Sequence, residues 1–222
     1  MMNKYPVSCV RNLGVLIDEG LTMQNHVQSI CQSSYHYLRN IRQIRPYLTI
    51  NAAKTIIHSI ISSRLDYCNS LLYGVPDFVI NKLQLLQNCA ARVVLNINKF
   101  DSITSGLKKL HWLPVKERIQ YKIILIVYKA LNGNQPIYIQ TMLEPYIPAR
   151  KLRSSDKQFI LKEKRAKLVT MGDRAFSISA PRLWNSLPDN IRNPGLELNA
   201  FKTNLKTFLF QKTFGRTEFQ AQ

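Results

Sequence analysis

Apolar residues recur at spacings of three and four along most of this chain, which is the pattern of α-helices that bury one face. The clearest stripe follows Asp77, with successive spacings of four, three, four, three and four. Its members are Val79, Leu83, Leu86, Ala90, Val93 and Ile97. Because Asp77 directly precedes the stripe, we expect its carboxylate to accept hydrogen bonds from the first free backbone N–H groups of this helix.

A second helix is predicted before this one, with Thr49 or Asn51 as its N-cap. Its apolar residues are Ile56, Ile57, Ile60, Ile61 and Leu65. The segment 73–76 contains Gly74 and Pro76, which favour a turn, so the two helices are expected to pair as an αα-hairpin.

Helical spacing predicts several more elements. They are a helix over 27–44 ended by Pro46, a short helix or turn over 103–110, a long helix from 115 that begins after Pro114 and closes at Gly133, a short segment over 137–143, a short helix opened by Ala180-Pro181 and ended at Leu187-Pro188, and a closing helix over 198–209.

Extended structure is expected in two places. Residues 9–18 are rich in Val, Leu and Ile around one Gly, which predicts a short strand without an obvious partner. Two further extended segments are predicted around a turn at 171–173. The fold class is therefore mainly α, a helical bundle with a short N-terminal strand and a small C-terminal hairpin-plus-helix region.

Composition adds a strong positive charge to this fold. The chain of 222 residues has 31 Lys and Arg against 13 Asp and Glu, a formal charge of +18. Such a field favours a polyanionic partner, although charge alone separates neither RNA from DNA nor either from lipid, and a merely basic surface is the alternative. Neither a signal peptide nor a membrane span is found in the sequence, so we expect no membrane partner and an intracellular protein, in the nucleus or cytoplasm and not secreted.

Basic side chains gather in two places that suit phosphate contacts. Three arginines lie on the polar face of the 27–44 helix, where a solvated face is the alternative explanation. Residues 149–174 form the sharpest cluster, with nine basic residues against three acidic ones. The candidate nucleic-acid-binding residues are Arg39, Arg42, Arg45, Arg150, Lys151, Arg153, Lys157, Lys162, Lys164, Arg165 and Lys167.

Catalytic and metal-binding patterns are not evident. The acidic residues are scattered, the four His have no acidic or thiol neighbour in sequence, and the four Cys lack zinc-ligand spacing. We therefore predict no catalytic residue, no metal site and no cofactor, and interpret Cys31, Cys68 and Cys89 as buried free thiols. Trp112 and Trp184 each precede Leu-Pro and are expected to fill the core rather than stack on bases.

Five stretches together resemble a known family. They are residues 12–18 (NLGVLID), 64–74 (RLDYCNSLLYG), 83–92 (LQLLQNCAAR), 110–115 (LHWLPV) and 183–188 (LWNSLP). In this order, over nearly the whole chain, they resemble the C-terminal part of reverse transcriptases from non-LTR retrotransposons, the jockey-like LINE group.

This resemblance implies a division into parts. They are the end of the palm (1–20), a thumb-like helical bundle (21–98), a second helical segment (99–147), a basic region with extended segments and a closing helix (148–214), and a tail (215–222). The family's paired aspartates and its endonuclease are not in this chain, and neither is the Cys-rich knuckle of some relatives. The resemblance thus implies a non-catalytic remnant of an RNA-directed DNA polymerase that binds RNA or template-primer duplex. The alternatives are a domesticated scaffold that binds a protein through the former palm-facing surface, in an oligomeric state that the sequence does not specify, and a marginally folded inert fragment.

Overall fold

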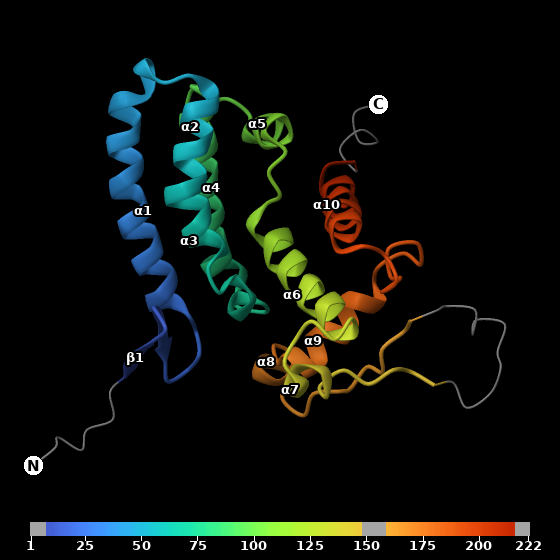
Figure 1. Ribbon diagram of the computed structural model, residues 1–222. Helices are drawn as coiled ribbons and strands as arrows, with labels where there is room; N and C mark the ends of the chain where they lie inside the picture. Colours follow the sequence, from blue (N-terminus) through green and yellow to red (C-terminus); the bar gives the residue numbers. More distant parts are fainter. Residues whose placement is uncertain (1–7, 148–158, 216–222) are drawn as a thin grey trace, which may run out of the picture. The chain divides into compact units, whose positions relative to one another are not determined.

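A computed structural model describes residues 8–147 and 159–215 of the chain (Figure 1). It divides into two compact units, Met1–Lys116 and Glu117–Gln222. The boundary lies within one helix, α6 (Val115–Leu131). Mainly helical structure with a short N-terminal sheet confirms the predicted fold class in these respects.

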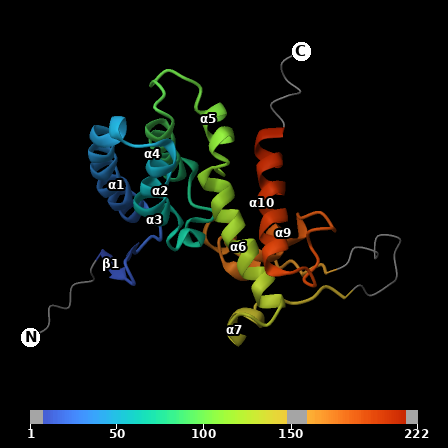
Figure 2. The same ribbon diagram turned by 45° about the horizontal axis from the view of Figure 1, so that its top comes forward.

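The first unit begins with a β-hairpin where the sequence predicted one unpaired strand. Strands β1 (Cys9–Asn12) and β2 (Val15–Asp18) pair antiparallel, with Asn12 opposite Val15. The two turn residues, Leu13 and Gly14, have φ values of 46° and 83°, as a two-residue type I′ turn requires. The prediction of one continuous strand over 9–18 was wrong, because the alternating pattern of these residues does not mark the turn that divides it. The hairpin lies at the N-terminal end of α1 (Figure 2).

Helices α1 to α4 and the turns between them make up most of the helical part of the first unit. Helix α1 (Gln24–Ile44) ends in a 3₁₀ turn at Arg45–Tyr47, as Pro46 predicted. Helix α2 (Ile50–Ile57) continues through a π-helical turn, η2 (His58–Ser62), into α3 (Ser63–Asp66). A 3₁₀ turn at Asn69–Leu72 then leads to α4 (Asp77–Leu95), which packs against both α1 and α2.

The N-cap was predicted correctly for α2 and wrongly for α4. The Thr49 hydroxyl accepts a hydrogen bond of 3.2 Å from the Ala52 N–H, so Thr49 is the N-cap of α2. The Asp77 prediction was wrong, since Pro76 is the N-cap of α4 and Asp77 is its first residue. The Asp77 carboxylate instead lies 3.6 Å from the Lys116 ammonium. At this position it still faces the positive end of the helix dipole.

The core of the first unit is the predicted stripe of α4 together with the facing sides of its neighbours. Five of the six stripe residues are buried, the exception being Ile97, which follows the left-handed C-cap Asn96. The facing core residues are Val27, Leu38 and Ile41 from α1 and Ala53, Ile57, Ile61 and Leu65 from the α2–α3 segment. Trp112, which follows α5 (Ile103–Leu110), is also buried and contacts His58 edge-on at 5.2 Å between ring centroids.

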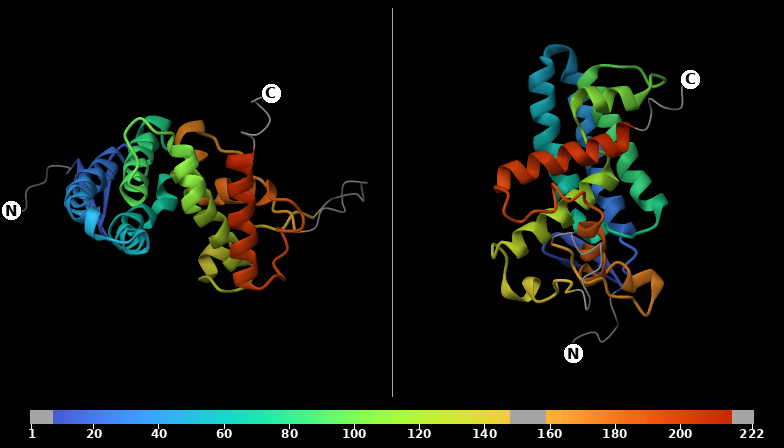
Figure 3. Two further views of the ribbon diagram at one scale, coloured as in Figure 1. Left: turned by 90° about the horizontal axis from the view of Figure 1, so that it is seen from above. Right: turned by 90° about the vertical axis from the view of Figure 1, so that its right-hand side faces the viewer.

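The second unit is built around α6 and α10 (Leu198–Phe214), which lie side by side (Figures 2 and 3). Tyr128 of α6 stacks on Phe201 of α10 with 4.0 Å between ring centroids, and Trp184 stacks on the same Phe at 6.0 Å. All three rings are buried, so the prediction that Trp184 fills the core is confirmed, as it is for Trp112.

Two predictions in this unit were wrong. The segment expected to form a hairpin around 171–173 is helical, with a single turn at α8 (Val169–Gly172) followed by α9 (Phe176–Asn185). Leu161 instead forms an isolated antiparallel bridge with Pro145. Pro181 lies inside α9 rather than at its start. Before these, α7 (Ile137–Gln140) is one helical turn.

Within each unit, side chains of the sequence motifs form hydrogen bonds to backbone groups of other segments. In the first unit, the Val115 N–H donates to the Gln84 amide oxygen at 2.9 Å, and the amide nitrogen of buried Gln87 donates to the Leu113 carbonyl at 2.9 Å. In the second, the Asn185 side chain both accepts from the Leu161 N–H and donates to its carbonyl. Each of these polar side chains thus has a structural partner within its own unit.

Candidate nucleic-acid interface

The predicted arginines of α1 lie beside a groove between α1 and α4. Arg39 and Arg42 are exposed and three residues apart, so both lie on one face of the helix. They line a cavity of about 560 Å³ together with Arg92 of α4 and Lys99 of the following loop. We call this cavity the α1–α4 groove. The tertiary structure therefore brings two further cations to the two that the sequence predicted.

The floor of the α1–α4 groove is apolar and aromatic. Leu38 and Val93 are buried there, and Tyr35 and Cys89 contribute more exposed surface. Burial, and then the nearby Cys89 and Cys31 thiols, raise the pKa of the Tyr35 hydroxyl to about 12. Tyr35 is therefore a neutral ring at physiological pH, which is the kind of surface on which a base stacks.

Positive charge in the α1–α4 groove is not balanced by acidic residues. The lining includes four cations and no carboxylate, and within residues 8–147 and 159–215 neither Arg39 nor Arg42 forms a salt bridge. Unpaired guanidiniums repel one another and attract anions. This arrangement suits phosphate groups.

Arg92 differs from Arg39 and Arg42 in having backbone partners. Its guanidinium donates to the carbonyls of Asn98, at 3.3 Å, and Asp101, at 3.2 Å. These bonds hold the loop that carries Lys99 against the end of α4. Sequence reasoning missed both residues, because the α4 stripe marked only the buried face and Lys99 reaches the groove through this loop. A signal for the loop was present in the Lys99-Phe100-Asp101 break of the apolar pattern.

Arg45, the third arginine predicted on this face, is used inside the fold. Its guanidinium donates to three backbone carbonyls, those of Val93 at 2.9 Å, Val94 at 2.8 Å and Leu48 at 2.8 Å. Val93 and Val94 lie in the last turn of α4, where carbonyls lack helical partners and a positive charge is favoured. Arg45 thus caps α4 and does not line the groove.

The basic C-terminal cluster falls partly outside the described residues, since Arg150, Lys151, Arg153 and Lys157 all do. Lys162 and Lys164 both pair with Glu144, at 3.2 Å and 2.7 Å. Hydrogen bonds from Lys164 and then Lys162 hold the pKa of Glu144 below its usual value. Arg165 and Lys167 are exposed.

Other chemistry in the described part of the chain is sparse. No group of three or more His, Cys, Asp and Glu side chains comes together there in a way that suits a metal ion. All four cysteines are free and half-buried rather than fully buried. None of the helices in residues 8–147 and 159–215 has both the length and the apolar character to cross a membrane.

Comparison with known proteins gives no relative. No protein-family model, curated protein or solved structure matches this chain significantly. The α1–α4 groove therefore has to be interpreted from its own residues.

Proposed function

We propose that this chain binds nucleic acid through the α1–α4 groove and is a non-catalytic relative of the thumb region of LINE-type RNA-directed DNA polymerases. The single observation that carries the proposal is the set of four cations around an apolar floor with no carboxylate among them. Lysine and arginine contacts to phosphates give affinity without sequence preference.

The floor of the groove adds a second interaction. Tyr35 is 40% exposed between the two helices, next to the apolar side chains of Leu38 and Val93. An aromatic ring between cations allows a base to stack while the flanking phosphates meet the guanidiniums. The preferred ligand is then a strand with at least one accessible base, in structured RNA or at a template-primer junction. The basic segment 150–167 is a separate candidate for phosphate contacts.

Fluorescence anisotropy tests this function. The purified chain is titrated into a labelled hairpin RNA, an RNA–DNA hybrid and a DNA duplex across a salt series. The proposal expects log K to fall steeply with log salt concentration, and the hairpin RNA or hybrid to bind more tightly than the DNA duplex. Equal, weak binding to all three that vanishes at physiological salt would contradict it and leave only generic basicity.

A protein-binding scaffold is the second proposal. Phe78 and Leu85 lie seven residues apart on one face of α4 and are 54% and 59% exposed. Exposed apolar groups on one helix face suit a protein partner. A concentration-dependent oligomer in light scattering, together with no affinity for any of the three nucleic acids, would favour this role over the first.

A further inference from the structure

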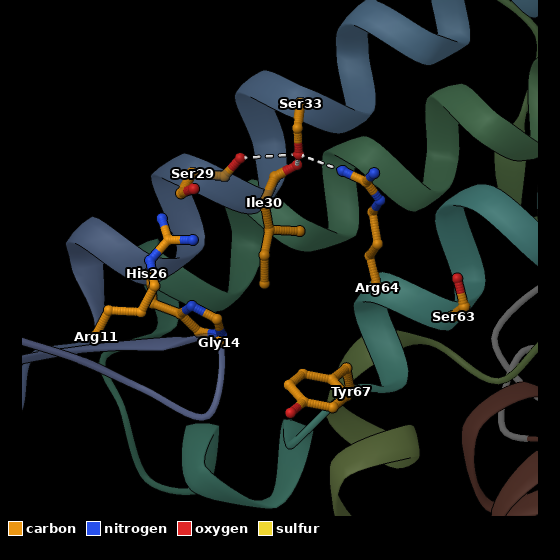
Figure 4. A pocket seen from close by; sticks show the side chains of 9 residues that line it. All are labelled: Arg11, Gly14, His26, Ser29, Ile30, Ser33, Ser63, Arg64 and Tyr67. Atoms are coloured by element: carbon orange, nitrogen blue, oxygen red, sulfur yellow. Dashed lines mark hydrogen bonds between the residues drawn. The ribbon is translucent and has the colours of Figure 1, made fainter.

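A second cavity lies in the first unit, where the β-hairpin meets α1 and α3 (Figure 4). Its volume is about 390 Å³, and we call it the hairpin pocket. It is distinct from the α1–α4 groove, since the two share no lining residue. Residues from the hairpin, from α1 and from the end of the α2–α3 segment line it, and it is open to solvent.

Two arginines face each other across the hairpin pocket. Arg11 comes from β1 and Arg64 from α3, and Figure 4 shows them on opposite sides of the cavity. No carboxylate lines the pocket, and Arg11 has no salt bridge among the residues that the structure describes. Two guanidiniums around one cavity favour a ligand with more than one negative charge.

Arg64 is held in place before any ligand arrives. Its Nη1 donates to the Ser33 hydroxyl at 2.7 Å, and its guanidinium lies 4.7 Å from the centroid of the Tyr37 ring. A guanidinium has five N–H donors, so this hydrogen bond leaves others for a ligand. A group that is already ordered loses less entropy on binding.

Neutral donors complete the lining. The His26 Nδ1 accepts a hydrogen bond from the Leu16 N–H at 3.4 Å, which leaves the proton of the neutral ring on Nε2. Ser29 contributes a hydroxyl from the next turn of α1. Oxyanions are commonly bound by this combination of guanidinium, imidazole and hydroxyl donors.

The wall opposite α1 is fixed by Tyr67. Its hydroxyl donates to the carbonyl of Leu13 in the hairpin turn at 2.6 Å, so the C-cap residue of α3 holds the turn in position. The π-helical turn η2 directly precedes Ser63 and Arg64 and changes the helix face on which they lie. Such turns are frequent at functional sites. The Tyr67 ring is 52% exposed beside the pocket.

We propose that the hairpin pocket binds a terminal phosphate monoester. A monoester carries close to two negative charges at neutral pH, which matches two arginines, whereas an internal phosphodiester carries one. Two sources offer a phosphate group of this charge, the 5′-phosphate of a nucleic-acid strand and free inorganic phosphate.

The test compares 3′-labelled single strands of one sequence that carry either a 5′-phosphate or a 5′-hydroxyl. The full chain should bind the phosphorylated strand about tenfold more tightly, as expected for added charge-assisted hydrogen bonds. Arg11→Gln should remove this preference and leave the affinity for the 5′-hydroxyl strand unchanged. Lys122→Gln, a single-charge control in the second unit, should retain the preference.

Further arms separate this inference from the proposed function and separate the two sources. Arg39→Gln with Arg42→Gln should weaken both strands equally and keep their ratio, because the groove does not read the strand end. Calorimetric titration with inorganic phosphate alone measures the free source, and Arg11→Gln should abolish any heat seen. Arg64→Lys, checked for folding by circular dichroism, should also reduce the preference, because lysine lacks the forked donors. Equal affinity of the two strands for the wild-type chain, with no heat from inorganic phosphate, would overturn the proposal.

Discussion

His26 is the buried titratable group whose protonation should matter most for the first unit. Burial, and then the positive charge of Arg11, lower its pKa below the ordinary value of 6.5. Arg64 lines the same pocket from α3, and no carboxylate does. As the pH falls, the unfolded chain therefore takes up this proton before the folded chain. The stability that depends on neutral His26 is complete above the unfolded pKa and is lost as the pH falls toward the lower, folded pKa.

A variant at this position tests the direction. His26→Gln should show a smaller fall in Tm than the wild-type chain between about pH 7.5 and about pH 5.5, the range around the unfolded pKa. The buffers must be free of phosphate, because an anion in the hairpin pocket would favour the imidazolium. Parallel curves for the two proteins would show that His26 does not titrate differently on folding.

Arg45 and Arg42 are close in sequence and differ in role. Arg45→Met should lower the free energy of unfolding by about 1–3 kcal/mol, because carbonyls at the end of α4 lose their charged donor. Arg42→Met should change it by no more than about 0.5 kcal/mol, as is usual for an exposed side chain without partners. Urea denaturation of both variants measures the difference. Equal stability of the two would contradict the capping role.

The LWNSLP motif acts as a clamp in the second unit, because its side chains hold the backbone of residues 159–161 by hydrogen bonds. Trp184 donates from Nε1 to the Phe159 carbonyl at 2.8 Å, and Asn185 pairs with both backbone groups of Leu161. Asn185→Leu should cost about 1–3 kcal/mol, because it leaves two backbone groups without their partner. Hydrogen exchange should show lost protection at the Leu161 amide, while the amides of α4 remain protected. Unchanged exchange at Leu161 would contradict the clamp.

Helices were predicted best where one apolar stripe decides the structure. Helices α1, α4, α5, α6 and α10 all lie where the spacing placed them. The hairpin was missed because its turn has Leu13 at positive φ, where Asn or Asp is the usual signal before Gly. Helix α9 was misplaced because Pro181 favours a helix start, whereas the packing of Ile178 and Trp184 keeps it in the middle of one.

Only two of the four cations that line the α1–α4 groove could be predicted from the sequence. Arg39 and Arg42 follow from helical spacing alone, since they lie three residues apart on the exposed side of α1, each next to a buried residue. Arg92 and Lys99 enter the groove because α4 packs on α1 and because Arg92 binds its own C-terminal loop. The hairpin pocket needs three elements to meet, so no local pattern marks it. The capping role of Arg45 is likewise a long-range property, with partners 48 and 49 residues away.

For the molecule as a whole, the question is whether its charge of +18 acts through a particular surface. A diffuse basic surface predicts that any two lost charges weaken nucleic-acid binding equally. A defined groove predicts that the loss depends on position. The variants of His26, Arg45 and Asn185 test the stability of the fold. A binding measurement is needed to decide between a diffuse surface and a defined groove.

The most direct measurement is the salt dependence of hairpin-RNA binding by the double variant Arg39→Gln, Arg42→Gln. Its control is Lys122→Gln with Lys206→Gln, which removes the same charge from exposed positions in the second unit. Each lost phosphate contact reduces the slope of log K against log salt concentration by about one, so the groove variant should lose about two and the control nearly nothing. Equal slopes for the two variants would contradict a nucleic-acid site in the α1–α4 groove.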